Sequence, residues 1–548
     1  MVFARRSTTL LAAIIASCAM VLSLTACTSD NKTVVDGQTT VTSNSAGGVA
    51  VFTPSDGITL NQQTPLNKWA KLVPDLAKAL ADAGFKKGDI DHTTSDSLAK
   101  QSRAIQDFVV DHLSNNTTDD SGIAIAPDNM TLLVAPVVEA DASTRQYGDY
   151  ISQNLSTNDA TDGEATSDGE SSEDDSSKDD SSKDDSSNTE SDSTASDEQA
   201  QAVDRLVSSL KLAKESGMHV VLLGNSIEGY KPDAFVKFSD AQTIGKLQAE
   251  KMVSKLKLDK ASKDNPKYIE VLLPYTAMDE KGNANDSTFA QEAFRGIWQV
   301  LGSYYQKGVV ESPSGTLDGK STENDWQAVA YDAAKEGSTA KVLDKRLAKT
   351  DGQSTLTRID GIITMNDYIA SEVVKELDDL GYTGSAADIN PQITISGIVG
   401  NITGKKDLSR DAVPDPIKSP ENDNANDSSS SDDDADEDTS ASDKDRDSQW
   451  PLVTGYGAYV SNIPSIVNGK QWMTGMEDRQ TIATDIAQAC AKLNKDEALN
   501  SMPSIRNSEV GGVKKIPTIS EPLLAVSASN LKSALIDPGY ISLADAGL

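Results

Sequence analysis

One strand–turn–helix unit, residues 358–382, constrains the fold more than any other part of the chain. Its sequence is RIDGIITMNDYIASEVVKELDDLGY. A short apolar run is followed by apolar residues at helical spacing from Ile369, and Gly381 marks the expected helix end. Asn366 and Asp367 stand in the turn, and ligands of open parallel sheets gather at this carboxyl end of a strand. The unit therefore predicts a parallel sheet with a binding edge, although a helix cap alone would also explain Asp367.

Similar alternations of strand and helix recur along the chain. Apolar runs predict strands at residues 49–53, 130–135, 219–223, 235–240, 268–273, 309–311, 392–399 and 452–456. Amphipathic stretches predict helices at residues 69–83, 96–113, 202–216, 241–256, 289–304, 326–344, 461–467 and 481–493. Strands that alternate with helices form parallel sheets covered on both faces. We therefore predict an α/β protein with two Rossmann-like parallel-sheet lobes joined by a hinge.

Two acidic segments interrupt this pattern. Residues 159–198 hold 16 acidic residues and two lysines, and residues 411–448 hold 14 acidic residues and three basic ones. Such segments have too few apolar residues to offset the entropy cost of ordering, so we predict disordered acidic inserts at 156–200 and 405–449. Solvated spacers explain them better than calcium collection, because no loop has the spacing and glycine of an ordered calcium site. The net charge of −34 also argues against nucleic-acid binding.

Residues 1–26 have the features of a secretory signal peptide. Two arginines precede an apolar run at 10–24 that is too short for a durable membrane span. The signal ends in Leu-Thr-Ala-Cys, which resembles the bacterial lipobox, so lipidation is expected at Cys27. An ordinary signal peptide with an incidental cysteine is the alternative. Residues 27–47 would then form a flexible tether, and we expect a lipid-anchored protein on the extracytoplasmic face of the cell membrane.

The sequence offers little for catalysis or metal binding. Its three histidines are scattered, and one of its three cysteines, Cys18, lies in the signal segment, so neither a metal site nor a disulfide framework is predicted. No nucleophile–base pair and no phosphate-binding GxxxxGK[ST] loop stands out. We therefore expect a protein that is not an enzyme and carries no cofactor.

Four stretches of the sequence resemble the type I periplasmic-binding family, in particular the xylose- and multiple-sugar-binding proteins of ABC importers. They are VAVFTPSDG followed by a helix that opens at Trp69; FVKFSDAQTIGKLQAEKMV; IDGIITMNDYIASEVVKELDDLGY; and the pair VTGYGAYVSNIPSIVNGKQWMTGMEDR and IPTISEPLLAVSASNLKSALIDPGYIS. The likeness covers most of residues 48–548 outside the acidic inserts. It implies the type I periplasmic-binding fold, in which two lobes close over a small ligand at a hinge.

The resemblance also implies a division of the chain. We expect the N-terminal lobe at 48–240, the C-terminal lobe at 241–476, a return to the N-terminal lobe at 477–510, and a tail at 511–548 that packs on the C-terminal lobe and hinge. Either of the strands 392–399 and 452–456 could line the hinge. The second is favoured because Tyr456 leads directly into the next helix.

By position, the resemblance implies a ligand site of aromatic, amide, hydroxyl and charged side chains. Aromatic rings stack on the apolar faces of sugars, and charged or amide groups bind sugar hydroxyls. The expected ligand-binding residues are Ser55, Asp56, Lys68, Trp69, Asn225, Ser226, Asn285, Phe289, Trp326, Asn366, Asp367 and Tyr456. Two places depart from the family: Asn225-Ser226, where it often has Asp-Arg, and Tyr456-Gly457-Ala458, where it often has Gln-Asp-Ala. Core packing is the alternative for Trp69 and Trp326.

The function implied by the resemblance is capture of a solute outside the cell. A lipid-anchored, monomeric solute-binding protein would take a small carbohydrate into the cleft between its lobes and deliver it to the permease subunits of an ABC importer. The alternative is a surface sensor or interaction protein that has the same two-lobe fold without coupling to transport. The departures at the expected site and the two acidic inserts favour this alternative.

Overall fold

The computed structural model describes residues 46–56, 65–115, 126, 129–138, 144–157, 189–278, 284–348, 356–386 and 449–548. The expected signal segment, most of the tether, the strand at 392–399 and the larger part of both acidic inserts lie outside these residues. No helix in the described part of the chain is both long enough and apolar enough to cross a membrane.

The first sheet contains seven strands within the described residues. In order across the sheet they are β15 (Ile505–Val510), β16 (Val513–Ser520), β7 (Ala234–Lys237), β5 (His219–Leu223), β3 (Met130–Val134), β1 (Gly48–Pro54) and β2 (Ile90–Ser95). Neighbouring strands are parallel except at the β15–β16 edge, where the pair is antiparallel. The expected parallel lobe is therefore present.

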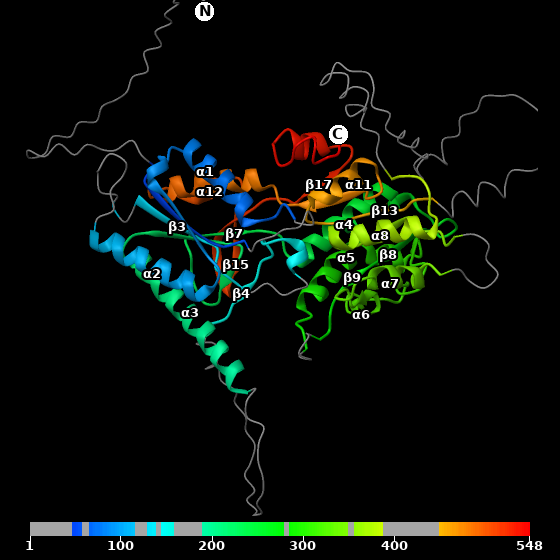
Figure 1. Ribbon diagram of the computed structural model, residues 1–548, viewed down its shortest axis with the longest axis horizontal. Coiled ribbons are helices and arrows are strands. Elements are labelled where there is room, and N and C mark those ends of the chain that lie inside the picture. The colour runs from blue at the N-terminus through cyan, green and yellow to red at the C-terminus, as the bar shows by residue number, and fades with distance from the viewer. Residues whose placement is uncertain are drawn as a thin grey trace, which may run out of the picture. The chain divides into compact units, whose positions relative to one another are not determined.

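Helices cover both faces of this sheet. On one face α1 (Trp69–Asp82) lies beside α12 (Arg479–Leu493), and on the other α2 (Leu98–Asn115) lies beside α3 (Thr189–Glu215) (Figure 1). Successive residues of β1 divide between the two cores: Val49 and Val51 pack under α1, and Ala50 and Phe52 pack under α2. A strand buried on both sides needs a continuous apolar run, which is what made β1 visible in the sequence.

The second sheet has four parallel strands among the described residues, in the order β10 (Val310–Glu311), β8 (Lys267–Val271), β12 (Gly361–Ile363) and β13 (Leu452–Val453). Two helices on one face, α4 (Ala241–Leu256) and α5 (Thr288–Gln306), pack closely at a pair of glycines. A Cβ at Gly245 would lie 2.2 Å from the Ala293 carbonyl oxygen, and one at Gly296 would lie 2.0 Å from that of Gln242. The helices α7 (Ser338–Arg346) and α8 (Asp367–Leu380) share the core on the other face.

Shorter elements complete the architecture around these sheets. Three pairs of strands are β9 (Leu273–Pro274) with β11 (Ala330–Tyr331), β4 (Asn154–Leu155) with β6 (Ser226–Ile227), and β14 (Met473–Met476) with β17 (Leu524–Ser527). Two short helices are α6 (Trp326–Val329) and α11 (Ile463–Val467). The chain passes from the first sheet to α4 after β7, returns through β14 and α12, and leaves again after β16 through β17. These crossings form the predicted hinge between two parallel-sheet lobes.

Four segments differ from the expectation. The sequence pattern misses β2, because this edge strand is largely exposed and lacks the apolar run of a buried strand. The range 326–344, expected to be largely helical, contains β11 between two helices. Residues 189–200, assigned to the disordered insert, are helical as the start of α3. The tail assignment of 511–548 to the C-terminal lobe and hinge is wrong for β16, which extends the first sheet beside β7 because Ile516 and Ile519 fill its opposite faces.

Candidate functional site

The turn after β12 places Asn366 at the carboxyl edge of the second sheet. Met365 adopts a left-handed conformation (φ 68°), which turns the chain sharply from the strand into α8. The helix cap that the sequence suggested for Asp367 belongs instead to Asn366, whose Oδ1 accepts a hydrogen bond of 2.9 Å from the Ile369 amide. Its Nδ2 donates to Oε1 of Gln146, at 3.0 Å. The fully buried Asn366 side chain therefore links the second lobe to a segment that follows β3 of the first.

The carboxylate of Asp367 is fully buried and has partners within its own lobe. Oδ1 accepts a hydrogen bond from Gln471 (2.7 Å), and Oδ2 accepts from the Tyr459 amide and the Thr474 hydroxyl, both at 2.9 Å. Burial raises the pKa of this carboxyl to about 6, although these donors favour the ionised form. Gly455 is required beside it, because a Cβ there would lie 2.1 Å from Oδ1. This carboxylate holds the turn after β13, and its expected contact with a ligand remains a prediction.

Tyr456 lies where segments from both lobes meet. Its hydroxyl accepts a hydrogen bond from Asn67 Nδ2 (3.0 Å) and shares one of 2.5 Å with the Ser239 hydroxyl. The Ser239 amide donates to Oε1 of Glu477, also at 2.5 Å. Glu477 is buried, and burial raises the pKa of its carboxyl to about 7. Ser239 and Glu477 lie on two of the crossings, so this network connects the strands of the hinge.

The expected residues of the first lobe contact the segment that follows β3. The Lys68 ammonium pairs with Asp149 at 2.7 Å, and the Trp69 amide donates to the other oxygen of that carboxylate at 3.2 Å. The Trp69 ring is buried against Tyr150, with ring centroids 5.0 Å apart. Asp56 accepts from the Ala70 amide at 3.0 Å. Burial, with the nearby Asp149 carboxylate, raises the pKa of Asp56 to about 6.

Asn225 and Ser226 contact the same segment farther along. Asn225 Oδ1 accepts from the Gln153 amide and its Nδ2 donates to the Pro136 carbonyl, each at 2.9 Å. The Ser226 hydroxyl donates to Oδ1 of Asn154 at 2.8 Å. Both residues therefore hold the short pairing of β4 with β6.

Three expected residues have contacts elsewhere. Asn285 Nδ2 donates to the Thr276 carbonyl at 2.8 Å, and the Asn285 carbonyl accepts from the Tyr275 hydroxyl at 3.1 Å. Trp326 packs edge-on against the Tyr275 ring, with centroids 5.1 Å apart. These two residues form a cluster around Tyr275. Ser55 is exposed beyond the end of β1, where its amide donates to the Ser95 carbonyl at 2.7 Å.

The segment 146–154 is the part of the site that sequence reasoning missed. Tyr147 is 1% exposed. The centroid of its ring lies 4.7 Å from the ring centroid of Phe289 and 6.3 Å from that of Tyr456. The Gln146 carbonyl accepts from the Tyr459 hydroxyl at 2.7 Å. Two tyrosines on either side of a glycine, in a stretch without strand or helix periodicity, were the available signal. The segment contacts Lys68, Trp69, Asn225, Ser226, Phe289, Asn366 and Tyr456, so it brings expected residues of both lobes together.

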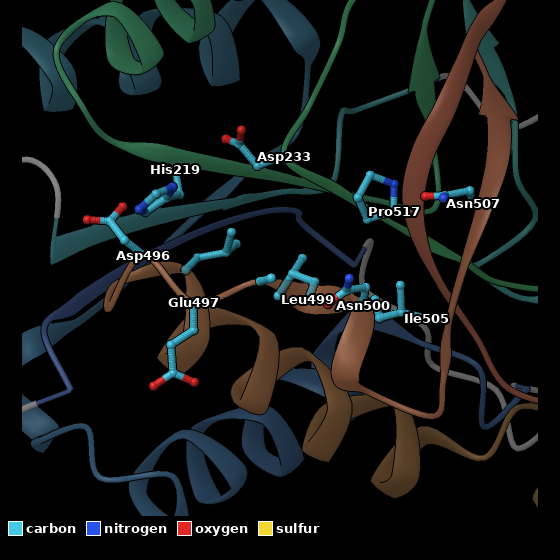
Figure 2. Close-up of a pocket in the computed structure, with 11 residues that line it drawn as sticks. His219, Asp233, Asp496, Glu497, Leu499, Asn500, Ile505, Asn507 and Pro517 are labelled. Carbon is cyan, nitrogen blue, oxygen red and sulfur yellow. The ribbon is translucent and has the colours of Figure 1, made fainter.

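A hollow of about 490 Å³ lies at the amino ends of strands in the first sheet, away from the residues described above. Figure 2 shows His219, the first residue of β5, beside Asp496 from the loop that follows α12. Asp233 also lines it, but pairs with Lys214 at 2.8 Å and accepts from the Val220 amide at 2.8 Å. Within the described residues no group of three histidine, cysteine or acidic side chains could hold a metal ion.

We compared the chain with protein families, curated proteins and solved structures. No protein-family model and no curated protein matches it. Similar solved structures include an ABC transporter solute binding protein from Clostridium phytofermentans with bound beta-D-glucose (TM-score 0.43, 17% identity, 91% of this chain and 99% of that chain). A carbohydrate transporter solute binding protein from Chloroflexus aurantiacus in complex with D-glucose has TM-score 0.43 and 17% identity over 92% of this chain and 98% of that one. A periplasmic ribose ABC transporter from Conexibacter woesei has TM-score 0.41 and 14% identity, over 90% and 96%.

The expected fold is confirmed by the strand pairing of this chain. Two parallel sheets, each covered on both faces and joined by repeated crossings, form the architecture implied by the resemblance to type I periplasmic-binding proteins. The sugars named above are ligands of those solved structures and are not assigned to this chain.

Proposed function

We propose that the chain is an extracytoplasmic solute-binding protein that takes a small carbohydrate between its two lobes and delivers it to an ABC importer. One observation carries the proposal: Lys68 and Asn225 of the first lobe, and Phe289, Asn366 and Tyr456 of the second, contact a single short segment between the lobes. Residues that contact one segment from two sides would also contact a small solute in its place.

The chemistry of these groups suits an uncharged, hydroxylated solute. Phe289 and Tyr456 offer aromatic faces, on which the C–H faces of a pyranose stack. Asn366 offers an amide group, now bonded to Gln146, that can donate to a hydroxyl oxygen. The Lys68 charge is already matched by Asp149, which leaves little attraction for a charged solute. A sugar fits this balance better than an amino acid or a phosphate ester.

The lipid anchor is supported by the sequence alone. Cys27 follows Leu-Thr-Ala at the end of the apolar run, and the first described strand, β1, begins at Gly48, directly after the proposed tether 27–47. A diacylated thiol there would keep the lobes at the outer face of the cell membrane, within reach of the permease.

The proposal is tested with the purified protein and a panel of pentoses, hexoses and disaccharides. A sugar that binds only the folded state raises the unfolding free energy by about 2.7 kcal/mol at a concentration of 100 Kd, which appears as a higher Tm. Calorimetric titration of each positive sugar then gives its affinity. If millimolar concentrations of every sugar leave Tm unchanged and release no heat, the carbohydrate proposal fails.

A surface sensor or interaction protein is the second candidate, and one observation favours it. The space beside Asn366 is filled by Gln146 and Tyr147 of the chain itself. A protein whose lobes stay closed in this way would present a fixed surface rather than exchange a solute. Sugar uptake measured in cells with and without this chain separates the two candidates, because only the importer component changes uptake.

A further inference from the structure

The segment 146–150 is attached to the first lobe by contacts that depend on its sequence. Gly148 has a φ of 99°, and a Cβ there would lie 2.5 Å from the Asn67 carbonyl oxygen, so only glycine fits. The next amide, of Asp149, donates to that same oxygen at 2.8 Å. Its carboxylate pairs with Lys68, and the Tyr150 hydroxyl donates to the Lys68 carbonyl at 2.5 Å. This end of the segment is therefore anchored to the loop that opens α1.

The other end of the segment enters the second lobe. Gln146 accepts from Asn366 through its side-chain oxygen and from the Tyr459 hydroxyl through its carbonyl. The Tyr147 ring packs against Phe289 and Tyr456 and belongs to the hydrophobic core of the second lobe. The segment thus presents an amide and an aromatic ring to the groups that would receive the hydroxyls and the apolar face of a sugar.

The fit of Tyr147 is incomplete. Its hydroxyl is buried and has no hydrogen-bond partner among the described residues. A buried polar atom without a partner carries a desolvation cost that ends when water reaches it. The ring is therefore held mainly by packing, because the Asn366 side chain beside its hydroxyl already bonds Gln146 and Ile369. Its removal from the second lobe releases the desolvation cost. A contact of this kind suits a reversible occupant better than a permanent part of the core.

We propose that residues 146–150 form an internal occupant of the interlobe site, which holds the lobes closed without a solute and must be displaced before a solute binds. The inference deepens the proposed function and rests on it for the identity of the site. The anchored end, 148–150, stays with the first lobe, and Gln146 and Tyr147 leave the second lobe as the lobes separate. The occupant lowers the affinity for solute by the factor by which the closed state is favoured.

The test compares the protein with the double variant Gln146→Ala/Tyr147→Ala. Hydrogen exchange at the residue 147 amide, which donates to the Thr144 carbonyl at 2.9 Å, reports release of the moving end of the segment. The radius of gyration from small-angle X-ray scattering reports separation of the lobes, and both are measured without any sugar. We expect at least tenfold faster exchange and a larger radius of gyration in the variant. Tyr304→Ala is the matched control, because Tyr304 lies about 22 Å along α5 from Phe289. It should change neither quantity.

A second variant keeps the inference falsifiable if the double variant does not fold. Tyr147→Phe removes only the hydroxyl, so the occupant should bind more tightly and exchange at the residue 147 amide should slow. A substitution that merely disturbed the core would speed exchange in both variants. Faster exchange in Tyr147→Phe, or unchanged exchange and radius of gyration in a folded double variant, would overturn the inference.

Titration of both proteins with D-glucose and D-xylose separates this inference from the proposed function. Tighter sugar binding by the double variant than by the unaltered protein supports both. If the lobes separate in the double variant but bind no sugar of the panel, the inference about the occupant stands and the carbohydrate proposal fails. If the two proteins bind sugar with equal affinity, the carbohydrate proposal is supported and the inference about the occupant is overturned.

Discussion

Replacing Glu477 by glutamine should stabilise the protein above neutral pH and leave it nearly unchanged in acid. The Glu477 side chain is 1% exposed and accepts a hydrogen bond from the Ser239 amide. Burial raises its pKa from 4.5 to about 7, and the nearby Asp240 carboxylate adds to the rise, while the Ser239 and Tyr456 hydroxyls oppose it. The folded state therefore favours the protonated carboxyl, which glutamine imitates at every pH.

The size of the effect follows from the pKa difference. A rise from 4.5 to about 7 corresponds to roughly 3 kcal/mol at 1.36 kcal/mol per pH unit. Because the folded pKa is the higher one, this stabilisation is fully present below about pH 4.5 and is lost as the pH rises through about 7. The Glu477→Gln variant does not lose it, so its advantage over the unaltered protein should grow to roughly 3 kcal/mol by pH 8.

Urea unfolding at pH 5, 6, 7 and 8 measures this advantage. Glu250→Gln is the control, because Glu250 is half exposed on α4 opposite Lys246 and should give a difference that does not change with pH. A difference between Glu477→Gln and the unaltered protein that stays constant across this range would refute the reasoning, since it would mean that Glu477 has the same pKa folded and unfolded.

Three further predictions concern the site and the anchor. Gly455→Ala should lower the unfolding free energy by roughly 1–3 kcal/mol in urea titrations, because its Cβ would overlap Oδ1 of Asp367. Asp367→Ala should lower it by roughly 3 kcal/mol, because the donors of Gln471, Thr474 and Tyr459 lose their acceptor, and an unchanged Tm would contradict this. Cys27→Ala should abolish incorporation of labelled fatty acid in cells, and continued labelling would place the anchor elsewhere.

The helices and buried strands could be predicted because their signal is local. β1, β5 and β12 are covered on both faces, so each appears as an unbroken apolar run, and α8 shows its apolar stripe and its terminal Gly381. The edge strand β2 lacks such a run because solvent covers most of its residues. The hydrophobic pattern of a strand reports which of its residues are buried, so an exposed edge strand has no such pattern.

The candidate site could be predicted only in part, for a related reason. Asn366 lies at the end of a strand, and the residues next to it in the sequence predict the turn that places it there. Trp69 also lies beside the expected site, but its ring faces the core because Tyr150 and Phe238, distant in sequence, pack against it. The position of a residue along its element is a local property, whereas the direction in which a large side chain is buried depends on contacts that sequence spacing does not contain.

Asn67 explains how the internal occupant and the hinge act on one another. Its carbonyl accepts from the Asp149 amide of the occupant, its Nδ2 donates to the Tyr456 hydroxyl, and its Oδ1 accepts from the Glu477 amide at 3.4 Å. The Tyr456 ring in turn packs against Tyr147. When Tyr147 leaves the second lobe, Tyr456 therefore loses a packing neighbour. The Tyr456 hydroxyl bonds Asn67 and Ser239, which belong to the chain segments at the hinge. The residue that supports the occupant also orders the hinge, so release of the segment and separation of the lobes should occur as a single step.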